Sequence, residues 1–223
     1  MSFIKKYLTK TIASQLRKPS GVLATKVGNK MNQTNEFLYD FTINTMEITT
    51  NESILEIGFG NGKFFEKIYS TGNNLRLSGL DFSPEMVKEA THNNQAAVAA
   101  GKLTLKLGSS DKIPFPDNSF DKVFCINVVY FWEKPADHVK EIYRVLKPGG
   151  KFYTSIRKKE SLEQMPFSKY GFNIYTSAEW INILEVNQFH FLYTQKTENE
   201  PDTELDGKFY KMESLCIVAD KKE

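Results

Sequence analysis

Cysteine is scarce in this sequence: Cys125 and Cys216 are the only two among 223 residues. Both lie in apolar runs typical of buried strands. Two cysteines cannot form a disulfide framework or a cysteine-rich metal site, so neither a disulfide scaffold nor a metal centre is expected. This scarcity favours a protein of the reducing cytoplasm.

Long apolar runs are also missing. The longest uncharged stretches, such as "VFCINVVYFW" at 123–132, are far shorter than the roughly 18 residues that a membrane-spanning helix needs. No apolar segment of a secretory signal follows Lys5 and Lys6. The sequence therefore predicts neither an integral membrane protein nor a secreted one.

Acidic residues are absent from the first 35 positions. Those positions hold seven bases: Lys5, Lys6, Lys10, Arg17, Lys18, Lys26 and Lys30. The other 188 residues carry 22 bases and 27 acids. Ile4, Leu8, Ile12 and Leu16 recur at helical spacing, which predicts an amphipathic helix. We expect it to dock on its own domain; a weak membrane-surface contact or a transit peptide is the alternative.

Beyond residue 50, strand-like and helix-like patterns alternate. Hydrophobic residues make up 40% of the chain and charged residues 25%, as in an ordinary soluble domain. Strands are predicted at 53–58, 75–81, 103–107, 120–127 and 151–156, and helices near 61–71, 84–100 and 135–146. Strands joined by helices of this length predict right-handed crossovers and a parallel sheet covered on both faces.

The last third of the chain changes character. Scattered aromatic residues at 157–176 indicate a loop or lid over the strand ends. A capping box of Thr176 and Glu179 begins a helix to about residue 186. Strands near 189–196 and 209–219 are joined without a helix, so they must pair antiparallel. We expect an N-terminal helical cap over 1–50 and one domain over 51–223.

Three glycines, at positions 58, 60 and 62 of "ILEIGFGNGKF", follow the first predicted strand. Glycine permits positive φ angles and a close approach of the main chain to a ligand. A phosphate-binding P-loop is excluded, because Ile57 stands five residues before Gly62 and Phe64 follows Lys63. A dinucleotide fingerprint has its third glycine one residue later, so this spacing disfavours NAD without excluding it. Asp81, at the end of the second strand, can hold a ribose in either case.

Four segments resemble the class I S-adenosylmethionine-dependent methyltransferases, above all the group that includes the ubiquinone and menaquinone biosynthesis C-methyltransferases. They are "LEIGFGNG", "LSGLDFSPEMV", "GSSDKIPFPDNSFDKVFCINVVYFW" and "EIYRVLKPGGKFYTSI". Their order and spacing match over about residues 50 to 160. The resemblance implies a Rossmann-like, doubly wound α/β fold with a seven-stranded sheet, mostly parallel, whose last strand is antiparallel.

The resemblance also implies a cofactor site for S-adenosylmethionine and its product S-adenosylhomocysteine. Glu56 and the main chain of the glycine turn (Gly58, Gly60 and Gly62) would hold the methionine end. Asp81 would accept hydrogen bonds from both ribose hydroxyls, Phe82 would lie against the adenine, and Asn127 would lie beside the sulfonium. The family's Asp-Ala pair is replaced by Ser109 and Ser110, with Asp111 one position late, so the adenine contact stays open among these three residues.

The acceptor side is less specific. His92, His138 and His190 are expected to be structural or exposed, and the catalytic residues stay unknown. Tyr130 and Phe131 follow Asn127 and are candidates for contact with the acceptor, with wall packing as an equal alternative. The sequence lacks the Pro-Pro run of amino-methylating nucleic acid enzymes and a basic stripe, so a small-molecule acceptor is expected rather than a nucleic acid.

Two other functions remain open from the sequence. One is an NAD-dependent oxidoreductase, and the other is a catalytically silent protein that binds S-adenosylmethionine and serves as a partner subunit. The expected assembly is a monomer or a homodimer.

Overall fold

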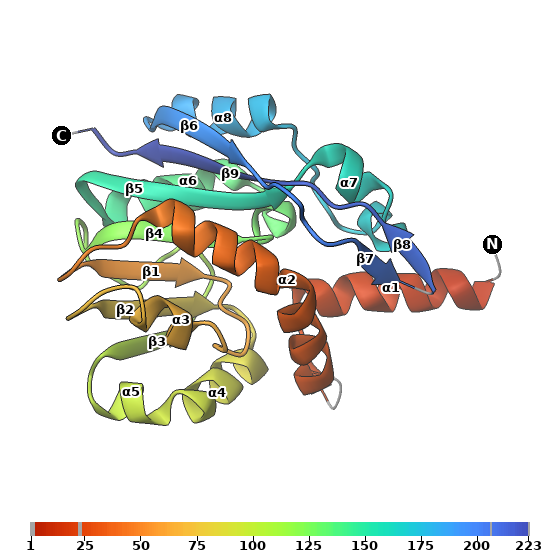
Figure 1. The fold of residues 1–223 in the computed structure, drawn as a ribbon, viewed down its shortest axis with the longest axis horizontal. Helices are drawn as coiled ribbons and strands as arrows, with labels where there is room; N and C mark the ends of the chain where they lie inside the picture. Colours follow the sequence, from red (N-terminus) through yellow and green to blue (C-terminus); the bar gives the residue numbers. More distant parts are fainter. Residues whose placement is uncertain (1–2, 22–23, 206, 223) are drawn as a thin grey trace.

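The computed structural model describes residues 3–21, 24–205 and 207–222. A seven-stranded sheet runs through the centre in the order β3-β2-β1-β4-β5-β9-β6 (Figure 1). Its strands are β1 (Ser53–Ile57), β2 (Arg76–Asp81), β3 (Leu103–Leu107), β4 (Phe120–Ile126), β5 (Leu146–Arg157), β6 (His190–Lys196) and β9 (Ser214–Asp220). β1 to β5 pair in parallel, and β9 lies antiparallel between β5 and β6. The predicted fold class and the antiparallel last strand are confirmed.

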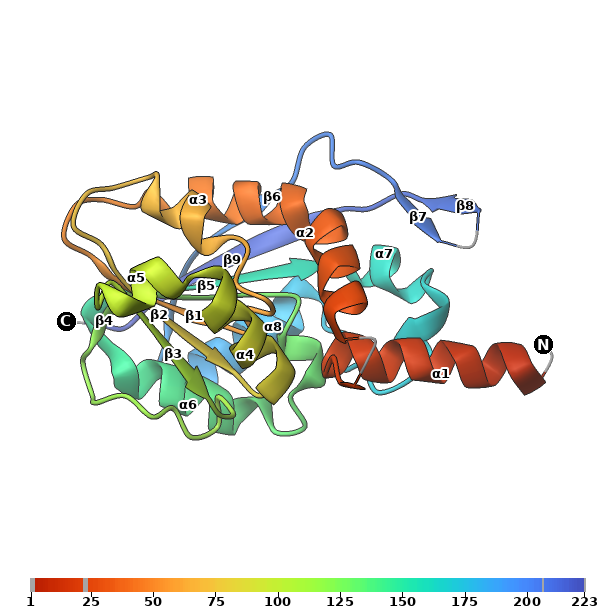
Figure 2. The same ribbon diagram turned by 90° about the horizontal axis from the view of Figure 1, so that it is seen from below.

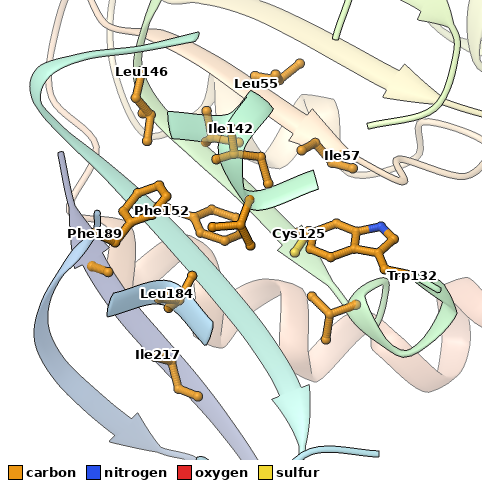
Figure 3. Packing of buried hydrophobic residues seen from close by; sticks show 14 of the residues in the cluster. Leu55, Ile57, Cys125, Trp132, Ile142, Leu146, Phe152, Leu184, Phe189 and Ile217 are labelled. Atoms are coloured by element: carbon orange, nitrogen blue, oxygen red, sulfur yellow. The ribbon is translucent and has the colours of Figure 1, made fainter. Parts of the chain in front are cut away.

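Helices cover both faces of the sheet, as Figure 2 shows. One face packs against α2 (Ala24–Met46), α3 (Phe65–Tyr69) and α4 (Pro84–Asn93) through a buried cluster that includes Leu38, Phe65 and Phe124. The other face packs against α6 (Pro135–Val145) and α8 (Ser177–Val186). Figure 3 shows this second cluster, in which Ile142, Leu184 and Phe152 interlock around the strands. Burial on both faces explains why the strands are near-continuous apolar runs.

Two helices differ from the predictions, and both differences lie next to the glycine turn. Gly60 and Gly62 take φ angles of 58° and 70°, so the helix expected from residue 61 begins only at Phe65. The helix expected over 84–100 breaks at Asn94 into α4 and α5 (Gln95–Ala99). The Asn94 side-chain amide donates to the carbonyls of Gly62 and Ala90. The break therefore ties the second helix to the glycine turn.

The C-terminal segment contains more structure than predicted. β5 begins at Leu146, so the "KPGG" stretch belongs to the strand. A small hairpin of β7 (Thr203–Leu205) and β8 (Lys208–Tyr210) lies in the acidic connection between β6 and β9. The 157–176 segment forms α7 (Lys159–Glu163) and the 3₁₀ turn η3 (Pro166–Lys169). The capping box at Thr176 and Glu179 is present.

The N-terminal segment forms α1 (Phe3–Arg17) and α2. The later part of α2 belongs to the main core, because Leu38, Ile43 and Met46 are buried there. The predicted apolar stripe of α1 docks only in part: Leu8 is 55% exposed and Ile12 is 41% exposed, whereas Leu16 is half-buried. The side chain of Ile4 lies outside the described residues. α1 instead buries Thr9 and Ala13.

Candidate active site

A cavity of about 480 Å³ lies at the carboxyl ends of β1, β2, β3 and β4, and residues of α1 and α2 line it from above. The chain order reverses between β1 and β4. Ligands of open α/β sheets bind at such a reversal point. The cavity therefore lies where the sequence placed the ligand site.

The three glycines have three different roles. Gly60 lines the cavity, and a Cβ built there would meet nothing within 4 Å. Gly58 also lines the cavity, but its Cβ would lie 2.4 Å from the Val128 side chain. A Cβ at Gly62 would lie 2.8 Å from Ala90 and from Asn94, and Gly62 is absent from the cavity wall. The main chain of Gly58 and of Gly60 therefore reaches the cavity, but only at Gly60 is the Cβ position open, whereas Gly62 serves helix packing.

Asp81 lies at the end of β2, where it is 6% exposed and lines the cavity. Its two carboxylate oxygens accept hydrogen bonds from the main-chain N–H groups of Gly60 (3.0 Å) and Ser83 (2.9 Å). Burial raises the pKa of Asp81 to about 6, although these N–H groups and Lys18 act in the opposite direction. Each oxygen retains a lone pair for a ligand hydroxyl.

Glu56 is buried beneath the cavity and does not line it. The Tyr39 hydroxyl, from α2, donates a 2.5 Å hydrogen bond to its carboxylate, and Tyr39 does line the cavity. Burial raises the pKa of Glu56 to about 8, and the Tyr39 bond opposes that shift. The sequence analysis missed Tyr39, which stacks on Phe64 with ring centroids 3.8 Å apart.

Asn127 follows β4 with a φ of 57°, in the left-handed region that asparagine tolerates better than other side chains. Its side-chain amide donates to Asn35 of α2 at 3.1 Å. A second link joins α2 to the glycine turn, where Asn32 donates to Asn61 at 3.0 Å. Both strand-end loops are therefore fastened to α2, and all four asparagines line the cavity.

The candidate adenine contacts differ in exposure. Ser109 and Asp111 are exposed at the cavity wall, whereas Ser110 is 5% exposed. The Ser110 hydroxyl and Nδ1 of His138 share a 2.7 Å hydrogen bond. Phe82 is exposed at the cavity wall, with Lys18 Nζ 5.4 Å from its ring centroid.

His138 is a second residue that the sequence analysis missed as part of the site. It stacks on Trp132 with ring centroids 4.5 Å apart, and both residues line the cavity. Burial lowers the pKa of His138, opposed by the carboxylates of Asp111 and Asp137. When the neutral imidazole accepts the hydrogen bond from the Ser110 hydroxyl, the serine oxygen is free to accept a hydrogen bond from a ligand.

The two candidates for contact with the acceptor, Tyr130 and Phe131, differ in position. Phe131 lines the cavity, and Phe172 of the 157–176 segment packs against it with ring centroids 4.8 Å apart. Tyr130 is 1% exposed and absent from the cavity wall. Its hydroxyl donates to Asn127 at 3.2 Å and accepts from the main chain of Arg157. The structure therefore brings Phe131 to the cavity and uses Tyr130 to join β4 to β5.

These residues fit S-adenosylmethionine. The strand ends offer open backbone at Gly60 and a buried carboxylate at Asp81. The two basic residues of the cavity wall lie elsewhere: Arg17 ends α1 and is paired with Glu133, and Lys134 directly precedes α6. Such a donor set suits a ligand with hydroxyls and an amino group and without phosphates. Fold and cavity together define a class I S-adenosylmethionine-dependent methyltransferase.

Comparison with known proteins agrees with this class. The methyltransferase domain family matches residues 55–154. The uncharacterized methyltransferase YdaC of Bacillus subtilis (strain 168) is 35% identical over 127 residues, which are 57% of this chain and 68% of YdaC. The chain therefore belongs to the methyltransferase domain family. The ubiquinone/menaquinone biosynthesis C-methyltransferase UbiE of Geotalea daltonii is 31% identical over 112 residues, 50% of this chain and 48% of UbiE.

A solved structure shares the fold over most of the chain. It comes from the complex between the Haloferax volcanii Trm112 methyltransferase activator and a methyltransferase, and it superposes with a TM-score of 0.78 at 21% identity. The match covers 90% of this chain and 94% of that chain. Neither the NAD-dependent oxidoreductase nor the catalytically silent protein is favoured by these similarities.

Within residues 3–21, 24–205 and 207–222, no helix is long and apolar enough to cross a membrane. Over the same ranges, no group of three or more histidine, cysteine, aspartate or glutamate side chains could hold a metal ion.

Proposed function

We propose that this protein transfers the methyl group of S-adenosylmethionine to a small-molecule acceptor. The observation that carries the proposal is the cavity at the strand reversal, which combines the open backbone of Gly60, the buried carboxylate of Asp81 and an aromatic wall at Phe131. The first two suit the cofactor, and the third leaves an apolar surface for an acceptor.

In this proposal Asp81 accepts hydrogen bonds from the two ribose hydroxyls, and the main chain at Gly58 and Gly60 receives the methionine end. Glu56 acts there through the Tyr39 hydroxyl, since Tyr39 and not Glu56 reaches the cavity. Phe82 covers one face of the adenine. Asn127, held by Asn35, lies beside the sulfonium.

For methyl transfer, the main task of the protein is to position the cofactor and the acceptor. When bound, S-adenosylmethionine supplies a methyl group that its sulfonium charge already activates. The cap residues Asn32, Asn35 and Tyr39 shield the cavity from water and hold the strand-end loops in place. Alignment of the reacting groups is worth roughly 7 to 11 kcal/mol in favourable cases, so a general base is optional.

The acceptor is proposed to be small because α1 and α2 line the cavity and Phe172 of the 157–176 segment packs against Phe131 of its wall. A nucleic acid is not proposed, since the 188 residues after the basic start carry 22 bases against 27 acids and offer no basic stripe. The assembly is proposed to be a monomer or a homodimer.

The test of the cofactor assignment is a calorimetric titration of the purified protein with S-adenosylmethionine, S-adenosylhomocysteine and NADH. Micromolar binding of the first two without NADH is expected, and labelled-methyl transfer to candidate small molecules then identifies the acceptor. Binding of NADH alone would overturn the proposal.

Cofactor affinity should depend on pH through Asp81. The ribose hydroxyls need the ionised carboxylate, whereas the free protein binds a proton at Asp81 below its pKa of about 6. Affinity for S-adenosylhomocysteine is therefore expected to fall as pH decreases through about 6, by at most about tenfold per pH unit. Titrations across this range check it. Asp81→Asn should bind S-adenosylhomocysteine weakly, with an affinity that does not change below pH 6. If the affinity of this variant still falls at low pH, another group is responsible for the titration.

The adenine contact should reside on Ser110 rather than Ser109. His138 orients the Ser110 hydroxyl, whereas the Ser109 side chain is exposed. Ser110→Ala is expected to weaken S-adenosylhomocysteine binding by about five- to tenfold, the effect of one neutral hydrogen bond. Ser109→Ala is the matched control with little change expected. The reverse order in the two titrations would assign the contact to Ser109.

A further inference from the structure

The outward face of α1 carries exposed apolar side chains. Tyr7 is 67% exposed, Leu8 55% and Ile12 41%. Eight large apolar side chains of the described residues are exposed, and three of them lie within these six positions. Thr9 and Ala13, on the adjoining face of the helix, are buried, and α1 packs against η3 and α2. The helix therefore has one face packed against the protein and one face, with Tyr7, Leu8 and Ile12, that is exposed.

The N-terminal segment carries charge of one sign, and one of its bases, Arg17, is paired with Glu133. The first 35 residues hold seven bases and no acid, whereas the remaining 188 residues carry five more acids than bases. A helix with an apolar face and basic flanks binds the interface of anionic membranes, where apolar side chains enter the headgroup region and bases meet lipid charges. A second copy of this chain docked by the same helix is a poorer occupant, because it would bring the four bases of its own α1 (Lys5, Lys6, Lys10 and Arg17) close to the same four bases here.

We propose that the outward face of α1, formed by Tyr7, Leu8 and Ile12, docks the protein on an anionic lipid surface. The far end of the same helix supplies Leu16 and Arg17 to the cavity wall. Figures 1 and 2 show α1 extending from this edge away from the sheet. Docking therefore places the cavity mouth next to the lipid surface. The proposal concerns attachment and does not depend on which acceptor the enzyme uses.

The test is co-sedimentation of the full chain with two kinds of vesicle, phosphatidylcholine alone and phosphatidylcholine with phosphatidylglycerol. Binding to the anionic vesicles is expected, with little to the neutral ones, and it should weaken at high salt because exposed charges are screened. The Leu8→Glu/Ile12→Glu double variant should bind at least about tenfold more weakly. The control is Val186→Glu, which changes a 68% exposed apolar side chain on α8 and should bind as the wild type does.

A second measurement separates loss of docking from loss of fold. Neither Leu8 nor Ile12 lines the cavity, so the double variant should keep its thermal midpoint and its affinity for S-adenosylhomocysteine. The proposal is overturned by equal binding to both vesicle types, by no binding to either, or by equal weakening in the Val186 control. A dimer in solution that the double variant dissociates would also overturn it, because a second copy would then cover this face.

Discussion

Asp81→Ala is expected to weaken S-adenosylhomocysteine binding by about 2 to 4 kcal/mol, or roughly 30- to 1000-fold. The carboxylate is buried at the end of β2 and lines the cavity. In the proposed complex it accepts from two ribose hydroxyls, and a hydrogen bond to a charged group is worth more than a neutral one. Calorimetric titration of the purified variant checks the prediction, and unchanged affinity would contradict the ribose assignment.

The control must separate binding from folding, because Asp81 also accepts from the main chain at Gly60 and Ser83. Asp81→Asn keeps an acceptor oxygen of the same size. The folded-state pKa of Asp81 is raised to about 6 from 3.8, so its contribution to stability is present at low pH and is lost as pH rises through about 6. Asparagine removes the buried charge, but its NH2 group cannot accept one of the two main-chain N–H bonds. The two effects oppose each other, so at neutral pH the variant should unfold at a denaturant concentration close to that of the wild type, yet bind the ligand weakly.

The sequence predicted the sheet well because its signals are local. Each parallel strand is a short apolar run, and Ser83 with Pro84 marks the start of α4, where the Ser83 side chain accepts from the Met86 N–H. The glycine turn located the ligand site, since φ angles of 58° to 77° at Gly58, Gly60 and Gly62 favour glycine. These features depend on neighbouring residues alone.

The missed parts of the site depend on contacts between distant residues. Tyr39 meets Glu56 across 17 positions, and His138 meets Ser110 across 28. Nothing in the local pattern of α2 distinguishes Tyr39 from a core aromatic residue. Likewise, Gly62 looked like a ligand contact, but only the packing of α4 against the turn shows that Ala90 and Asn94 require its small size.

The exposed stripe of α1 was also beyond a sequence argument. Periodicity predicts that Leu8 and Ile12 share a face, but it does not determine which face the domain covers. The structure buries the side with Thr9 and Ala13 instead. A pattern of apolar residues thus identifies a binding face without identifying its partner.

Gly58→Ala is expected to destabilise the folded protein by about 2 to 5 kcal/mol. The backbone there has a φ of +77°, which costs a residue with a side chain roughly 1 to 2 kcal/mol. The new Cβ would also lie 2.4 Å from Val128 Cγ2, and overpacking of this kind adds about 1 to 3 kcal/mol. Urea unfolding of the purified variant measures the total.

Gly60→Ala is the matched comparison, because its φ is +58° and its Cβ would meet nothing within 4 Å. We expect it to cost only the backbone part, about 1 to 2 kcal/mol, while its methyl group enters the cavity and weakens S-adenosylhomocysteine binding. Adding Val128→Ala to Gly58→Ala should recover the overpacking part. Equal losses of stability at both glycines, without recovery in the double variant, would contradict this prediction. Backbone strain alone would then explain the cost, and the contact with Val128 would contribute nothing.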